Sequence, residues 1–143
     1  MKYIARLYSE ILNEVRQSKI KEDKIKILRE NDCEGLRELF QYTYGTTENP
    51  YKNGVPKYKP DDSPFGYSYT NLSKEMKRLS YFYNTKYQIS NEKMRDKKLR
   101  NLLELLHFSE ASLLENVFSG NLDTYNITKE LVLEAFPNLN IGS

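Results

Sequence analysis

The chain has 143 residues, enough for one domain with a buried core. It contains twelve Tyr but only one Cys and one His, which excludes an internal disulfide and a structural zinc site built from several Cys and His. No apolar run approaches the roughly 18–20 residues needed to cross a bilayer, and the charges at Arg6, Glu10 and Glu14 exclude a secretory signal. These features predict a protein of the cytoplasm with no membrane segment.

The net charge of +2 is distributed unevenly. Residues 1–50 contain nine Lys/Arg and nine Asp/Glu, residues 51–100 contain twelve and five, and residues 101–143 contain one and six. The middle of the chain is therefore suited to contact with nucleic-acid phosphates. The last third is suited to a basic partner or to the middle of a second copy, so head-to-tail self-association is allowed.

Three helices are predicted before residue 45. The first covers residues 2–18, where apolar residues recur every three to four positions: Ile4, Leu7, Tyr8, Ile11, Leu12 and Val15. A weaker stripe predicts a second helix over 20–30. Asp32 is the expected N-cap of a third helix that ends at Gly45 and is slightly weakened by Gly35. One face of that helix carries Leu36, Leu39, Phe40 and Thr43.

Residues 45–69 are predicted to form a long loop. They contain four of the five prolines, which remove backbone donors and fix φ. Loops of this length are uncommon in compact domains and are usually functional or disordered. The tyrosines and Phe65 in this loop favour one that packs back onto the helices.

Four further helices follow the loop. One is predicted over 71–83, and the next starts near Ser90 and becomes richer in leucine toward Leu106. Ser109 is the expected cap of another, which Gly120 ends, and the last runs from a Thr128 cap to Pro137. No strand pattern of similar strength occurs. The sequence thus predicts an all-α fold, an irregular bundle of six or seven short helices forming a single domain over residues 1–143.

Candidate catalytic residues are few. His107 is expected to pack or to cap carbonyls at the end of the leucine-rich helix, and Cys33 lacks a base and lies beside carboxylates that oppose a thiolate. Asp61 and Asp62 fit a turn before Ser-Pro better than a cation loop. Recognisable phosphate-binding, nucleophile-elbow and metalloprotease motifs are absent. The sequence predicts no catalytic residue, no metal site, no cofactor and no enzymatic activity.

Two candidate binding surfaces remain. Proline and aromatic residues of the loop form the candidate protein-binding site: Tyr51, Pro56, Tyr58, Pro60, Phe65 and Tyr67. The basic, tyrosine-rich segment 51–100 is a candidate nucleic-acid site, since cations neutralise phosphates and aromatic rings stack on bases. Its cations are Lys74, Lys77, Arg78, Lys93, Arg95, Lys97, Lys98 and Arg100. The favoured alternative is that these lysines form a solvated helix surface and that the tyrosines fill the core.

Three stretches resemble a family of small proteins from contractile-tailed bacteriophages. They are the loop GVPKYKP (54–60) with SPFG (63–66), the helical LLELLH (102–107) with EASLL (110–114), and the ending ITKELVLEAFP (127–137). The resemblance covers residues 36–139. The family has no established activity, so the resemblance implies the cytoplasm of an infected bacterial host and no catalytic residues.

We therefore expect a non-catalytic phage accessory protein that binds a host or phage protein through the loop. The alternative is a nucleic-acid-binding protein of phage replication or transcription that uses residues 51–100.

Overall fold

The structure is a computed structural model that describes residues 7–45, 51–62, 68–79, 82, 92–139 and 141. Within these residues the chain forms seven α-helices, two short 3₁₀ helices and no β-strand, which confirms the all-α prediction. In chain order the elements are α1 (Tyr8–Gln17), α2 (Lys21–Glu30), α3 (Glu34–Tyr44), α4 (Leu72–Glu75), η1 (Met76–Leu79), α6 (Glu92–Leu105), α7 (Phe108–Ser119), η3 (Asp123–Tyr125) and α8 (Lys129–Ala135).

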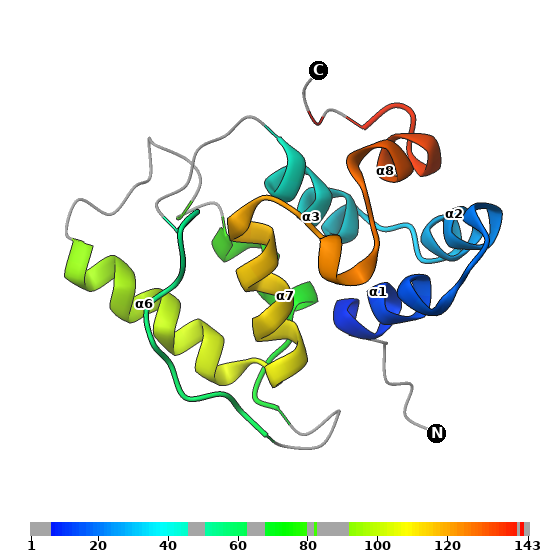
Figure 1. The fold of residues 1–143 in the computed structure, drawn as a ribbon. Helices are drawn as coiled ribbons and strands as arrows, with labels where there is room; N and C mark the ends of the chain where they lie inside the picture. Colours follow the sequence, from blue (N-terminus) through cyan, green and yellow to red (C-terminus); the bar gives the residue numbers. More distant parts are fainter. Residues whose placement is uncertain are drawn as a thin grey trace.

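Helix α7 lies in the middle of the molecule (Figure 1) and packs against α1, α3 and α6. On one side of α7, helix α6 forms an outer edge. On the other side, α2 packs against both α1 and α8. Since α7 contacts helices from both halves of the chain, its burial joins those halves around one hydrophobic core.

The predicted apolar stripes of the first and third helices point into this core. Helix α1 buries Tyr8, Ile11, Leu12 and Val15, and α3 buries Leu36, Leu39, Phe40 and Thr43. Gly35 has a packing role in addition: a β-carbon at this position would overlap the Tyr8 hydroxyl. The glycine lowers intrinsic helix propensity, but it makes room for α1 to approach α3.

Two predicted N-caps are wrong. Cys33 occupies the cap position of α3, while the Asp32 carboxylate binds Arg37 at 2.6 and 3.1 Å. Ser109 lies inside α7, and the side chain of His107 caps that helix by accepting the Ser109 backbone N–H. His107 therefore caps the N-terminus of α7. The sequence had instead suggested a role at the C-terminal end of the preceding helix. In both cases a neighbouring residue offers the backbone geometry of the cap.

The helix predicted over 71–83 is divided. Asn71 caps α4, which passes into the 3₁₀ helix η1 after one turn. A 3₁₀ turn places residues three apart on the same side, so Met76 and Leu79 are buried together. The predicted stops agree with the structure at Gly120, whose φ of +92° ends α7, and at the end of α8 before Pro137. Ser90 and Tyr83 lie outside the described residues.

Residues 51–62, which we call the strap, run across α6 (Figure 1) and contain no helix or strand. Their first residue, Tyr51, is buried, with its ring 6.0 Å from that of Phe82 and 5.4 Å from that of Phe118. The strap is thereby fastened to the core at its beginning. The remainder of the predicted loop, residues 46–50 and 63–67, is outside the described part.

Candidate interaction surface

A buried carboxylate ties three helices together. Glu110, in the first turn of α7, has no exposed surface. One oxygen of its carboxylate accepts the backbone N–H of Tyr8 at 3.1 Å, and the other accepts that of Leu72 at 3.0 Å. These donors are the first residues of α1 and α4, whose N–H groups have no partner within their own helices. Glu110 therefore caps two helices from a third.

Burial raises the pKa of Glu110 to about 7, and the two backbone N–H donors act in the opposite direction. The charge of Glu10 adds a smaller upward contribution to this pKa. The cause is physical: an apolar surrounding penalises the ionised carboxylate more than hydrogen bonding favours it. Folding stability should therefore depend on pH through this residue.

His107 and two serines extend this polar cluster. The Nδ1 atom of His107 accepts the Ser109 N–H at 3.1 Å and lies 2.7 Å from the Ser109 hydroxyl, which is 2.8 Å from that of Ser9. Since Nδ1 accepts from a backbone N–H, the proton of the neutral ring is on Nε2. The hydroxyl pair joins α7 to α1. The distance between His107 Nδ1 and the Ser109 hydroxyl is similar to that between a catalytic base and its nucleophile, but the similarity is limited to this distance.

Most of the polar cluster is enclosed by protein, and only Ser109 is half-buried. Ser9, His107 and Glu110 are all buried, with His107 the most exposed at 2%. A catalytic base and nucleophile must reach a substrate, whereas capping groups need only reach backbone N–H groups. The geometry therefore supports structural roles for these residues. Among the residues that the structure describes, no group of three or more His, Cys, Asp and Glu is placed to hold a metal ion.

The strap is held on the α6–α7 pair along its length. Tyr51 donates to Asp96 at 2.8 Å, Tyr58 donates to Glu115 at 2.6 Å, and the Lys59 N–H donates to Glu104 at 2.8 Å. Near its end, the carbonyl of Asp61 accepts the Phe108 N–H at 3.1 Å. Asp61 also accepts the hydroxyl of Ser68 at 2.7 Å, so it orders the backbone here.

These contacts separate the predicted loop residues. Tyr51 is part of the core and is not available to a partner, while Pro56 and Tyr58 are half-buried and Pro60 is exposed. Burial and the bond to Glu115 raise the pKa of Tyr58. Phe65 and Tyr67 lie outside the described residues. The protein-binding role of the loop stays a prediction, and of the predicted residues in its described part Pro60, near the end of the strap, is the exposed one.

An exposed apolar surface lies at the junction of α6 and α7. Leu105 ends α6, Phe108 begins α7, and Tyr69 precedes a residue, Thr70, whose N–H donates to the Leu105 carbonyl at 3.4 Å. Their exposures are 38% for Leu105, 48% for Phe108 and 87% for Tyr69. We call these three residues and Pro60 the corner surface. Backbone hydrogen bonds connect the segments that present them.

The corner surface is anchored by the polar cluster. The Phe108 ring lies against that of His107, with 4.5 Å between centroids, and the Phe108 backbone is bonded to the strap. Two residues further on, Glu110 secures α4, which follows Tyr69 in the chain. Apolar side chains held outward on ordered backbone are typical of binding sites. Sequence reasoning did not single out Leu105 and Phe108, and it included Tyr69 only as one tyrosine of the basic segment 51–100.

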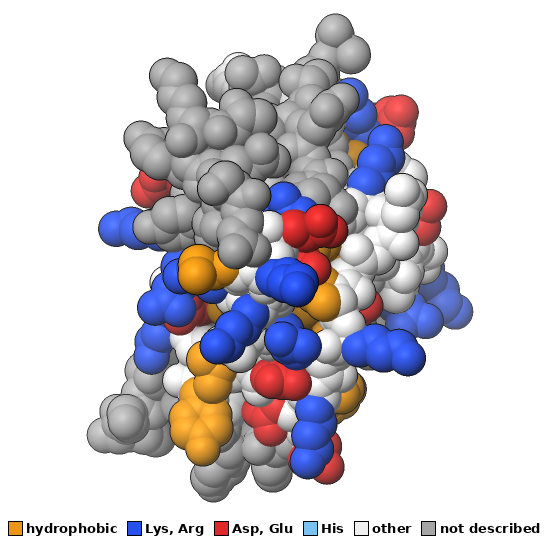
Figure 2. Space-filling model, turned by 90° about the vertical axis from the view of Figure 1, so that its left-hand side faces the viewer, with side chains coloured by type: hydrophobic (Ala, Val, Ile, Leu, Met, Phe, Trp, Pro, Cys, Tyr) orange, Lys and Arg blue, Asp and Glu red, His pale blue; other side chains and the backbone are white. Residues whose placement is uncertain are grey.

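The predicted nucleic-acid residues differ in how exposed they are. Arg95 is half-buried and lies over the Tyr51 ring at 5.5 Å, while Arg78 forms an ion pair with Glu75 at 3.1 Å. The other predicted cations are all exposed: Lys74, Lys77, Lys93, Lys97, Lys98 and Arg100. Figure 2 shows many Lys and Arg side chains on one face, with carboxylates between them.

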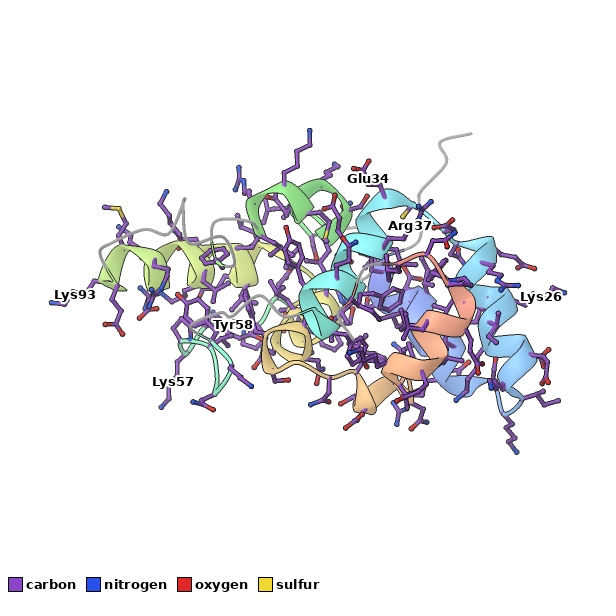
Figure 3. All side chains as sticks on the ribbon, turned by 90° about the horizontal axis from the view of Figure 1, so that it is seen from above. Lys26, Glu34, Arg37, Lys57, Tyr58 and Lys93 are labelled. Atoms are coloured by element: carbon purple, nitrogen blue, oxygen red, sulfur yellow. The ribbon has the colours of Figure 1, made fainter. Side chains whose placement is uncertain are left out.

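The uneven charge of the sequence persists in space. The strap, α4, η1 and α6 together carry eleven Lys/Arg and six Asp/Glu, whereas residues 108–139 carry one and five. Figure 3 places Lys57 and Tyr58 of the strap toward the same end of the molecule as Lys93. Lys26 of α2 lies at the opposite end, and Glu34 and Arg37 of α3 lie between these ends. The strap and α6, which contribute Pro60 and Leu105 to the corner surface, thus carry more Lys and Arg than Asp and Glu.

Cys33 is exposed, and its sulfur is 3.7 Å from the Tyr8 hydroxyl. Cys33 is the only cysteine in the sequence, and the only histidine is His107. In the described parts of the chain, no helix is both long and apolar enough to cross a membrane.

The all-α fold and the corner surface define a helical protein with a candidate binding face. Comparison with known families gives a more particular assignment: residues 11–124 match the family described as "Family of unknown function (DUF6433)". Because the match covers most of the chain, the protein belongs to this family. It matches no curated protein and no solved structure.

Proposed function

We propose that the protein is a non-catalytic binding protein whose corner surface docks onto another protein. The observation that carries the proposal is the exposure of Tyr69, Leu105 and Phe108 on segments joined by backbone hydrogen bonds. Single exposed apolar residues are ordinary, but a group presented from ordered backbone is typical of recognition sites. Aromatic residues are also enriched in the energetic centres of interfaces.

The bordering charge suggests the partner's chemistry. Helix α6 and the strap each contribute a residue to the corner surface and carry more Lys and Arg than Asp and Glu, so a partner with carboxylates around an apolar centre would be complementary. Together with the resemblance to phage proteins, this favours an accessory role in an infected bacterial cell, with a host or phage protein as partner.

Affinity capture with paired variants tests the proposal. A tagged Tyr69→Ser/Phe108→Ser double variant should lose at least about tenfold of the captured partner, since interface aromatics commonly contribute more than 1.4 kcal/mol. Ile20→Ser is the matched control, because Ile20 is 57% exposed but lies outside the corner surface. Retention of the partner by the double variant, or equal loss in the control, would contradict this role.

The exposed cations of α6 support nucleic-acid binding as the second candidate. Lys97, Lys98 and Arg100 are exposed, and no ion pair is recorded for them within the described residues. If they contact phosphates, affinity for labelled single-stranded DNA or RNA should fall steeply with salt, and the slope should decrease in a Lys97→Gln/Lys98→Gln/Arg100→Gln variant. A charge-matched Arg16→Gln/Lys19→Gln/Lys26→Gln variant should keep the slope. A flat salt response would eliminate this candidate.

A further inference from the structure

A groove separates α3 from the segment that follows α8. It has a volume of about 490 Å³, and one wall consists of polar residues at the start of α3 and just before it. The other wall is largely apolar and includes Ala135, Phe136, Pro137 and Leu139. Phe136 is buried and its ring lies 6.1 Å from that of Phe40, so the apolar wall is continuous with the core. Volumes of about 300–1,000 Å³ are typical of sites that receive side chains or small ligands.

The polar wall has unbalanced negative charge. Arg37 contributes the only cation among the residues lining this groove, and its guanidinium makes two hydrogen bonds to Asp32. Two lining carboxylates remain, Glu34 and Glu38, which are one helical turn apart. Like charges at this spacing repel each other.

The environment of Glu38 reflects this excess. Burial raises its pKa most, and the charge and hydrogen bonding of Glu34 raise it further. Lys77 of η1 acts in the opposite direction, and the charge of Glu34 also acts on Arg37, so two cations face the three carboxylates Asp32, Glu34 and Glu38. A further cation beside Glu34 and Glu38 would favour the ionised form of both carboxyl groups and be attracted to each.

We propose that this groove binds a short segment of a partner protein in which a lysine or arginine is flanked by apolar residues. The cation would lie between Glu34 and Glu38, and an adjacent apolar side chain would cover Phe136 and Leu139. Charge complementarity selects this occupant over an acidic segment, and the apolar wall selects it over a purely basic one. The groove is lined by none of the corner-surface residues, so this site is additional to the proposed function.

Titration of the ¹⁵N-labelled protein with a defined peptide tests the proposal. The probe is the acetylated, amidated peptide Leu-Arg-Leu-Lys-Leu, followed by amide chemical shifts. Saturable shifts should centre on Glu34, Glu38 and residues 135–139. Replacing both cations of the peptide by Gln, or all three leucines by Ser, should each weaken binding at least about tenfold, because each change removes one of the two complementary features.

A pair of protein variants supplies the control. Glu34→Gln/Glu38→Gln should weaken binding of the peptide about tenfold or more. Glu22→Gln/Glu130→Gln removes the same charge outside the groove and should leave the affinity unchanged. The proposal is overturned by shifts centred elsewhere, by absence of saturable shifts, or by equal affinity in the two variants. Groove signals that move with protein concentration alone would instead assign the groove to a second copy of the chain.

Discussion

The two ends of α7 differ in the kind of side chain that they bury. At the C-terminal end Val117 and Phe118 are buried and Ser119 is exposed, as in most amphipathic helices. At the N-terminal end Glu110 is fully buried, whereas Phe108, at the surface, is 48% exposed. The same helix therefore places an aromatic ring in the core at one end and an acid in the core at the other.

The difference shows what each end is required to do. The C-terminal end fills space between α3, the strap and α6, and the driving force there is removal of apolar surface from water. The N-terminal end receives the first residues of α1 and α4, whose unpaired N–H groups require an acceptor inside the protein. A buried carboxylate meets that requirement, and the ring of Phe108 is left facing outward.

The largest loss of stability is expected from a substitution at the C-terminal end of α7. Phe118→Ala removes a ring that packs against Tyr51 at 5.4 Å and Phe82 at 6.1 Å, so it should destabilise the protein by about 3–5 kcal/mol. Urea unfolding followed by circular dichroism measures this loss. Phe118→Leu retains most of the apolar volume and should cost less. Equal losses for both variants would show that packing volume is not what the residue provides.

The stability that Glu110 contributes at the N-terminal end of α7 should depend on pH. The pKa of Glu110 is about 7 in the folded protein against an ordinary value of 4.5, so the folded state binds the proton more tightly than the unfolded chain. Stability contributed by this residue is complete below pH 4.5 and is lost as pH rises to 7 and above. With about 1.4 kcal/mol per pKa unit, the loss is on the order of 3 kcal/mol.

Glu110→Gln removes this titration, so the difference between the variant and the wild type isolates its contribution to stability. Urea unfolding at pH 5, 6, 7 and 8 should give a flatter stability profile in the variant, because an amide does not ionise. At pH 5 the Glu110 carboxyl is protonated in the folded protein, but its hydroxyl oxygen can still accept a hydrogen bond and an amide NH2 cannot, so the variant should be less stable at this pH by about 1–3 kcal/mol. Glu22→Gln, at an exposed position, should keep the wild-type profile. An unchanged profile in Glu110→Gln would refute the assignment.

A smaller effect is expected at His107, where capping and chemistry can be separated. His107→Ala removes the acceptor of the Ser109 N–H and should cost about 1 kcal/mol, with an added loss from the ring contact to Phe108. Asn is a favourable N-cap, so His107→Asn should restore the capping part. Thermal unfolding distinguishes the variants. Equal destabilisation by Asn and Ala would show that capping is not the role of the ring.

Much of the fold could be predicted because periodic apolar residues determine which helix faces are buried. The stripes of α1 and α3 and the stops at Gly120 and Pro137 follow directly from local sequence. Cap identities failed at Asp32 and Ser109 because adjacent residues compete for one position and tertiary contacts decide between them. The short α4 and its 3₁₀ continuation also depend on packing, since Met76 and Leu79 are buried together.

The candidate surface was harder to predict because exposure is a tertiary property. Leu102–Leu106 contains four leucines that read as one buried group, but Leu105 lies on a different side of α6 from the buried Leu99 and Leu103. The helical angle of Leu105 is a local signal that could have identified it. Tyr51 and Tyr69 have no such signal: both are loop tyrosines, yet one is in the core and the other is exposed.

The smallest stability effect should accompany the largest effect on binding. Tyr69→Ser/Phe108→Ser removes two exposed rings, and surface substitutions usually change stability by no more than about 0.5 kcal/mol each. The unfolding midpoint in urea should therefore remain close to that of the wild type, while partner capture decreases. Glu110→Gln provides the opposite comparison, because it should lower stability while leaving the exposed rings in place. A double variant that unfolds as readily as Glu110→Gln would show that the two rings stabilise the fold. That result would contradict a binding role for the exposed residues at the N-terminal end of α7.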